Sequence, residues 1–407
     1  MRSIAGRIMR AIAAGAWLAA MAVLFGAEAC GNNAIFFGGA TTTATVTSTS
    51  TFAPPTSTAT GTASATPTPG VLGFVTNNGD GSLSEFSRNP STGLMALIAS
   101  TNVGASPGPT GLAVGASGQF LYVANAGDTL IREYAVNVST GALTALASVS
   151  DGINSAPQQI TYDPVDSFLC AANQGNGSVS GYLVNSNGTL TASATFSGSG
   201  LVAPFGIASA PGGGAIFVTD ISAGTVFSFT VGASGSLTLA STNPSLGPAG
   251  TGTPQGIAVD PRGLFVYVVD TRAAVVSVFS VGTGAALTFV ASYSTSALIN
   301  QPVGIALANN PTLGLFLYTS NQAVSTLSAF TVTSGALTLA SSLGGLGSPT
   351  GLVSDSTGSF LYAVNQILGT VSQFSIGSNA SLTSLGSVNT ENPQNPLSSP
   401  LYIVLSP

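Results

Sequence analysis

The chain has 407 residues, of which 44% are hydrophobic and only 5% charged, and its formal net charge is −6. It contains no His and no Lys, so His-based catalytic triads, His general bases, His-ligated metals and a nucleic-acid surface of clustered cations are excluded. The lack of cations also gives no support for electrostatic binding to anionic lipid, and no cofactor is expected.

Residues 1–29 have the layout of a secretory signal peptide. Three Arg residues precede an apolar run from Ala11 to Phe25, and the small residues Ala27 and Ala29 come just before Cys30. Cys30 resembles the lipid-acceptor Cys of bacterial lipoproteins, although Ala27 stands where such motifs more often have Leu. An unlipidated secreted protein is the alternative. Both interpretations predict an exported protein, periplasmic or extracellular, and the favoured one anchors it to a bacterial membrane only through a lipid on Cys30.

Residues 30–70 form a low-complexity linker. The stretch from Ala40 to Gly70 contains thirteen Thr, four Ser and four Pro and no charged residue. Such a composition cannot pack a core and is typical of flexible stalks that carry O-linked glycans. We therefore expect the linker to hold the rest of the chain away from a membrane.

The sequence from Val71 to Pro407 consists of seven copies of one pattern. In each copy an Asn or Asp is followed nine residues later by an aromatic residue, while the spacing between copies varies from 44 to 51 residues. The constant offset indicates that two strands and the turn between them are the same in every copy. The pairs are Asn77 and Phe86, Asn125 and Tyr134, Asn173 and Tyr182, Asp220 and Phe229, Asp270 and Phe279, Asn321 and Phe330, and Asn365 and Phe374.

Each copy contains four short strand signals, and the first of them opens with Pro. Four strands in roughly 40 to 50 residues is the period of a β-propeller blade. The region starts at Val71 without a Pro strand and ends with an unpartnered one at Pro400. We therefore predict an all-β, seven-bladed propeller over residues 71–407, closed by the C-terminal strand and monomeric.

In a propeller, the turns between second and third strands share one face with the connectors between blades, and ligands usually bind there. The sequence places the Asn/Asp residues of the repeat on this face, together with Asp80, Asp128, Asp151, Arg272 and Glu391. A structural role is favoured for the repeated residues, because Asn or Asp at the end of a strand can bond its own turn.

Asp220, Asp270 and Arg272 are less repetitive and are weak catalytic candidates. An Arg beside carboxylates can hold an anionic group or a polarised carbonyl. A plain surface ion pair is the favoured alternative. No metal-binding loop is found.

The phrases FLYVAN, FVYVVD, FLYTSN and FLYAVN, each followed by a V-S-x-F-like strand and a GALTLAS-like strand, resemble the seven-bladed propeller lactonase family. That family includes propeller-type 6-phosphogluconolactonases and carboxymuconate cyclases and grades into YVTN-repeat surface proteins. The resemblance implies the fold of Val71 to Pro407. The cyclase-type members are associated with a His, Arg and Glu constellation, which cannot be carried over to a chain without His.

Two functions follow, and whether the chain is an enzyme stays open. The first is an exported, membrane-anchored binding or scaffold module at the cell surface, with an unknown partner or small-molecule ligand. The second is a lactone hydrolase of the 6-phosphogluconolactonase kind with a His-free site, in which Asp220 or Asp270 is the base and Arg272 holds the carbonyl. The sequence favours binding, because the expected ligand face offers few cations for a phosphorylated lactone.

Overall fold

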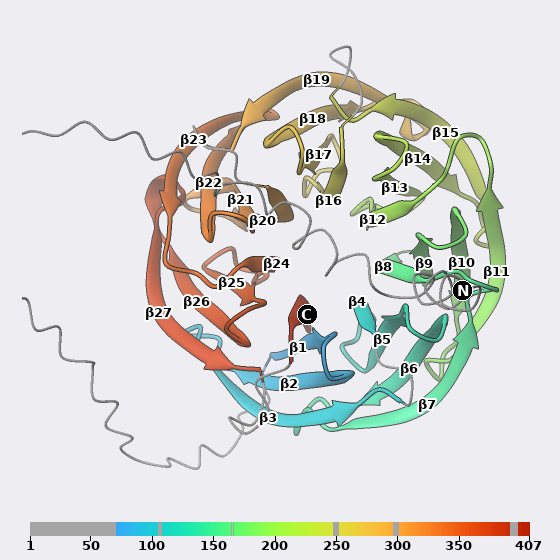
Figure 1. Cartoon of the computed structure of the whole chain (residues 1–407), viewed down its shortest axis with the longest axis horizontal. Coiled ribbons are helices and arrows are strands. Elements are labelled where there is room, and N and C mark those ends of the chain that lie inside the picture. The colour runs from blue at the N-terminus through green and yellow to red at the C-terminus, as the bar shows by residue number, and fades with distance from the viewer. Residues whose placement is uncertain are drawn as a thin grey trace, which may run out of the picture. The chain divides into compact units, whose positions relative to one another are not determined.

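The computed structural model describes residues 71–104, 108–163, 165, 167–246, 252–295, 301–390 and 398–407. This part of the chain folds into seven four-stranded antiparallel sheets, arranged as the blades of a ring (Figure 1). The predicted all-β, seven-bladed propeller is therefore confirmed. The predicted signal peptide and linker, with Cys30, and the candidate Glu391 lie outside the described residues. None of the helices in the described part is long and apolar enough to cross a membrane.

Each blade runs from an inner strand near the ring axis to an outer strand at the rim. From inside outward, the strands of blades A to D are β28 (Pro400–Leu405), β1 (Leu72–Asn77), β2 (Ser82–Arg88) and β3 (Met95–Asn102); β4 (Pro109–Val114), β5 (Phe120–Asn125), β6 (Leu130–Val136) and β7 (Leu143–Ser150); β8 (Pro157–Asp163), β9 (Phe168–Asn173), β10 (Ser178–Val184) and β11 (Leu190–Ser197); and β12 (Pro204–Ser209), β13 (Ala215–Asp220), β14 (Thr225–Val231) and β15 (Leu237–Pro244).

Blades E to G continue the same order around the ring. Their strands are β16 (Pro254–Val259), β17 (Phe265–Asp270), β18 (Val275–Val281) and β19 (Leu287–Ser294); β20 (Pro302–Asn310), β21 (Gly314–Asn321), β22 (Thr326–Thr333) and β23 (Ala336–Leu343); and β24 (Pro349–Ser354), β25 (Phe360–Asn365), β26 (Thr370–Ile376) and β27 (Leu382–Asn389). Two single-turn 3-10 helices, η2 (Thr283–Ala285) and η3 (Ser378–Ala380), precede the outer strands of blades E and G.

The C-terminal strand closes the ring, as predicted. Strand β28 pairs antiparallel with β1, with Gly73 opposite Leu405 and Val75 opposite Ile403. Blade A is thus built from both ends of the propeller sequence (Figure 1). The pairing covers the inner edge of β1, which could otherwise pair with another molecule.

The core lies between neighbouring blades. The seven aromatic residues that follow the Asn/Asp positions are at most 5% exposed, because each projects from a third strand into the packing between sheets. Near the axis the inner strands come so close that side chains are excluded. A Cβ on Gly304 would lie 2.1 Å from the Thr350 carbonyl oxygen, and one on Gly351 would lie 2.6 Å from the Leu401 carbonyl oxygen. This close approach explains why Gly recurs in the inner strands.

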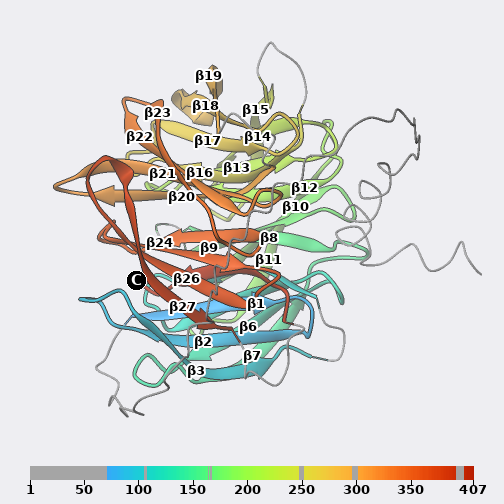
Figure 2. The ribbon, with the colours of Figure 1, turned by 60° about the vertical axis from the view of Figure 1, so that its left-hand side comes forward.

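The turns divide the propeller into two faces, which lie at the two ends of the strands (Figure 2). One carries the starts of the inner strands, the turns between second and third strands and the connectors between blades, and it is called the ring face here. The turns between first and second strands, and between third and fourth strands, form the opposite face. In blade B, for example, Pro109 pairs with Asn125 at the ring face, and Val114 pairs with Leu121 at the opposite face.

Candidate functional site

Four of the five repeated Asn residues stabilise their own hairpins on the ring face. Asn77 donates from Nδ2 to Ser82 Oγ at 3.0 Å and to Ser84 Oγ at 2.8 Å, five and seven residues further on. Asn173, Asn321 and Asn365 make the same pair of bonds to hydroxyls at the same offsets. These side chains are at most 1% exposed. These bonds agree with the structural role that the sequence favoured for the repeated residues.

Asp220 occupies this position in blade D, where Thr225 and Phe227 stand five and seven residues further on. Its Oδ2 accepts the backbone N–H groups of Val202 and Ala203 at 2.6 and 2.9 Å. Its Oδ1 accepts those of Ser222 and Ala223 at 3.0 and 2.8 Å. The carboxylate is fully buried, and both oxygens are occupied by donors from the blade connector and the turn.

Asp270 has the same environment on the next blade. Its Oδ2 accepts the Ser245 hydroxyl at 2.9 Å and the Thr253 N–H at 3.0 Å, and its Oδ1 accepts the Ala273 N–H at 2.9 Å. It is also fully buried. A general base needs a reachable lone pair, and in this arrangement neither Asp220 nor Asp270 offers one.

Arg272 lies in the turn after β17 and is exposed. Within the described residues it belongs to none of the three ion pairs, which are Arg88 with Asp355, Arg132 with Asp128, and Arg262 with Asp260. The structure therefore places Asp270 and Arg272 in one turn without an ion pair between them, and Asp220 on the neighbouring blade.

Two further candidates, Asp80 and Asp128, support the turns that contain them. Asp80 Oδ1 accepts the N–H and the hydroxyl of Ser82 at 3.1 and 2.9 Å. Asp128 accepts the Leu130 N–H at 3.2 Å and forms an ion pair with Arg132 in the following strand. Each side chain is partly exposed, so it remains accessible from the ring face.

Asp151 follows the outer strand of blade B and enters the seam with blade C. It is 5% exposed, and the Tyr182 hydroxyl donates to its Oδ1. Burial raises the pKa of the Asp151 carboxyl, while hydrogen bonds from Ser180, Tyr182 and Asn173 oppose that shift. Burial, with the nearby Asp151 charge, raises the pKa of Tyr182 too. The sequence did not predict this contact between Asp151 and the repeated aromatic position.

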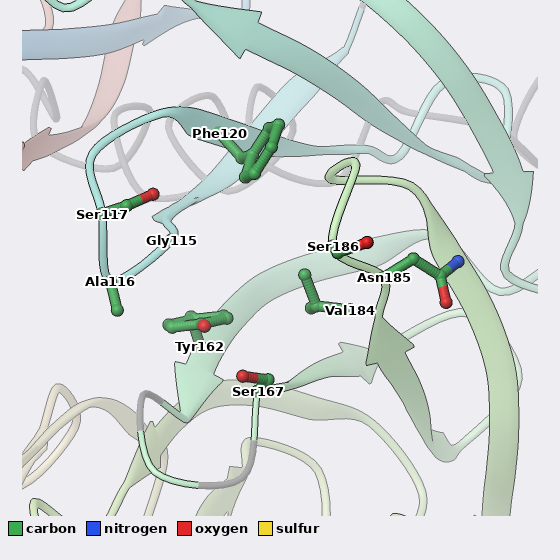
Figure 3. Close-up of a pocket in the computed structure, with 9 residues that line it drawn as sticks. All are labelled: Gly115, Ala116, Ser117, Phe120, Tyr162, Ser167, Val184, Asn185 and Ser186. Carbon is green, nitrogen blue, oxygen red and sulfur yellow. The ribbon is translucent and has the colours of Figure 1, made fainter.

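A pocket lies on the opposite face, between blades B and C, and not on the face where the sequence placed the ligand candidates. Its volume is about 210 Å³. Figure 3 shows Phe120 and Tyr162 on different sides of it, with Val184 between. The remaining lining residues are Gly115, Ala116, Ser117, Ser167, Asn185 and Ser186.

A signal for this pocket does exist in the repeat. Five residues after the opening Pro, Tyr162 is the only aromatic among the seven copies, where the others have Val114, Ser209, Val259, Leu307, Ser354 and Leu405. Ten residues before the Asn/Asp position, Gly115 stands where blades C, E and G have Asp163, Asp260 and Asp355. Departures from a structural repeat are where an individual site is expected.

Comparison with known families confirms the resemblance inferred from the repeat. The family model described as "Lactonase, 7-bladed beta-propeller" matches residues 43–152 and 317–401. A search of curated proteins finds no match to this sequence.

Several solved structures share the fold. A putative 6-phosphogluconolactonase from Bacteroides fragilis has a TM-score of 0.70 and 19% identity, with 84% of this chain and 99% of that chain covered. The periplasmic gluconolactonase of Pseudomonas aeruginosa has a TM-score of 0.69 and 18% identity, covering 83% and 98%. A Lactobacillus plantarum protein has a TM-score of 0.68 and 19% identity, covering 83% and 99%. At these identities the likeness establishes the fold and not the reaction.

Proposed function

We propose that this chain, a seven-bladed propeller of the lactonase type, is an exported binding or scaffold module at the cell surface. The observation that carries the proposal is the burial and hydrogen bonding of Asp220 and Asp270. Both carboxylates are buried on the ring face, and their oxygens are taken by donors of the fold itself. The residues that would serve as base in a hydrolase therefore act as parts of the scaffold.

Exposed apolar side chains on the ring face support a binding role. Ile153, in the connector from blade B to blade C, is 87% exposed, and Ile367 and Leu368, in the turn after β25, are 76% and 58% exposed. Apolar side chains that project from loops gain free energy when a partner removes them from water. The linker predicted before the propeller would give the propeller the reach that a surface module needs.

A lactone hydrolase is the second candidate. It is supported by the family match and by neighbours described as gluconolactonase or putative 6-phosphogluconolactonase. Arg272 is exposed on the ring face and would hold the lactone carbonyl. A base would have to come from Asp220 or Asp270 after release from its N–H donors, or from another carboxylate of that face. A neutral lactone suits a site with one candidate cation better than a phosphorylated lactone does.

The two candidates are separated by measuring hydrolysis with the full-length chain in detergent. A pH-stat records acid release from gluconolactone, 6-phosphogluconolactone and acyl-homoserine lactones for the unaltered chain, Arg272→Ala, Asp270→Ala and the control Arg262→Ala. Arg262 is 61% exposed on the opposite face, so its removal leaves the ring face unchanged. Turnover that is lost in Arg272→Ala and kept in Arg262→Ala would establish the hydrolase and overturn binding as the main function. Without turnover, cross-linking on intact cells should capture a partner.

The location is tested separately. If Cys30 carries lipid, the chain fractionates with membranes and mass spectrometry finds a diacylglyceryl modification on Cys30. Cys30→Ser should then release the chain into the soluble exported fraction. Recovery of the unaltered chain from the cytoplasm would contradict the export on which the proposal depends.

A further inference from the structure

At the opposite face, blades C, E and G carry an Asp at the start of the turn between first and second strands, and blade B does not. Asp163, Asp260 and Asp355 hold their turns by accepting backbone N–H groups, as in the bonds from Ser359 and Phe360 to Asp355 Oδ1 at 2.8 Å. Blade B has Gly115 at this position and therefore no side chain there. Gly115 lines one side of the pocket.

On the blade C side of the pocket, one residue also departs from the repeat. Tyr162 lies at the end of β8, and its ring lines the pocket across from Phe120 (Figure 3). Phe120 has a structural reason to be there, because it packs against Gly188 of the next blade just as Phe360 packs against Gly93. No such packing pattern recurs at the Tyr162 position, since the other six copies have Val, Ser or Leu.

The chemistry of the lining points to an uncharged ligand rich in hydroxyl groups. None of the nine lining residues carries a charge, so phosphate or carboxylate groups would find no ionic partner among them. Ser117, Ser167 and Ser186 supply hydroxyls that both donate and accept hydrogen bonds. The aromatic walls supply apolar faces against which the C–H side of a sugar ring can lie.

The size of the pocket suits a single ring. Its volume is about 210 Å³, somewhat more than the roughly 150 Å³ of a cavity that binds benzene. One six-membered ring with its hydroxyl groups therefore fits, and further units of a glycan would lie outside, because the pocket is open to solvent. We infer that the pocket between blades B and C binds one neutral sugar unit, such as the terminal residue of a glycan. The inference deepens the proposed binding function and rests on it.

The test uses saturation-transfer NMR on the full-length chain in detergent, with methyl glycosides of glucose, galactose and mannose as probes. Glucose 6-phosphate serves as the charged comparator and cyclohexanol as a ring with one hydroxyl. At least one glycoside should bind with a Kd of about 1 mM, because one small ring makes few contacts, and both comparators should bind about tenfold more weakly.

Two variants return the pocket to the pattern of the other blades. Tyr162→Val introduces the residue of blades B and E, and Gly115→Asp introduces that of blades C, E and G. A Cβ at position 115 meets no clash, because its nearest atoms are 3.7 Å away. Each variant should weaken glycoside binding about tenfold or more, while Tyr293→Val, at a half-buried tyrosine of blade E, should leave it unchanged.

Equal binding of cyclohexanol or glucose 6-phosphate, or binding that survives both pocket variants, would overturn the inference. Absence of glycoside binding would overturn it too. Capture of a cell-surface partner in that case would leave the proposed binding function standing, so the two failures are distinguishable.

Discussion

Arg88 and Asp355 form a buried ion pair across the seam between blades A and G, where the ring closes. Arg88 Nη1 lies 3.6 Å from Asp355 Oδ2, and the two side chains are 3% and 1% exposed. The same seam contains the hydrogen bond from the Tyr362 hydroxyl to the Gly93 carbonyl oxygen at 2.7 Å. The two ends of the propeller sequence are therefore joined by charge as well as by strand β28.

Removing Arg88 should destabilise the propeller strongly. Arg88→Met leaves Asp355 buried without its cation, and breaking one partner of a buried pair typically costs about 3–5 kcal/mol. The matched control is Arg262→Met, because Arg262 also pairs with an Asp of the opposite face but is 61% exposed, so about 1 kcal/mol or less is expected. Urea unfolding gives both values. Equal losses in the two variants would show that closure does not depend on the buried pair.

The tyrosines of the second strands allow a sharper comparison. Tyr362→Phe removes the donor to the Gly93 carbonyl and should cost about 1–2 kcal/mol. Tyr267 occupies the equivalent position in blade E, but its buried hydroxyl has no hydrogen-bond partner among the residues that the structure describes. Tyr267→Phe should therefore be neutral or stabilising. Thermal unfolding of the two variants checks the opposite signs, and a comparable loss in Tyr267→Phe would mean that its hydroxyl does find a partner.

Glu133 should make the stability of the propeller depend on pH. The side chain is 1% exposed, and burial raises its pKa above the ordinary 4.5, opposed by a hydrogen bond from the Leu190 backbone. Below about pH 4 both the folded and unfolded states hold the proton. As the pH rises past 4.5, the unfolded chain releases it first, so stability falls until the folded carboxyl ionises too, by at most about 1.4 kcal/mol per pH unit.

Glu133→Gln should remove this dependence and stabilise the protein at neutral pH. The chain itself supplies the precedent, because Gln373 occupies the equivalent position in blade G and accepts the Met95 N–H at 2.6 Å. Urea midpoints measured from pH 4 to pH 8 for Glu133→Gln and the unaltered chain provide the check. Parallel curves for the two proteins would show that Glu133 ionises normally in the fold.

The fold could be predicted from the repeat because its spacing reflects direct pairing. Asn77 is the last residue of β1. Phe86, nine residues later in β2, pairs with Gly73 of β1, so the constant offset reflects the geometry of a single hairpin. Closure could be predicted because the strand that starts at Pro400 is followed by no second strand, while the first copy lacks its Pro strand. The pairing of neighbouring strands and the number of strands can both be read from a linear sequence.

The sites could be predicted less well, because they depend on which blades meet. Asn173 and Asp220 occupy the same repeat position, yet one donates to its own hairpin and the other accepts from a blade connector. The pocket brings together Gly115 and Tyr162, 47 residues apart, on different sheets. The repeat shows that each residue is unusual at its position, but only the seam shows that they face one cavity.

The contrast between Asn and Asp on the ring face leads to the last prediction. Asp220 accepts four backbone N–H groups, and an amide in its place would direct an NH₂ group at N–H donors that cannot reverse their role. Asp220→Asn should therefore cost about 2–3 kcal/mol, since buried donors lose their acceptor.

Asp80→Asn is the matched control, because Asp80 is partly exposed and an Asn oxygen can still accept from Ser82. A change within about 0.5 kcal/mol is expected there. Urea unfolding compares the two substitutions. If Asp220→Asn destabilised the protein as little as Asp80→Asn, the Asp220 carboxylate would not be needed for the stability of the fold. A role for Asp220 as a catalytic base would then be the better explanation of its position on the ring face.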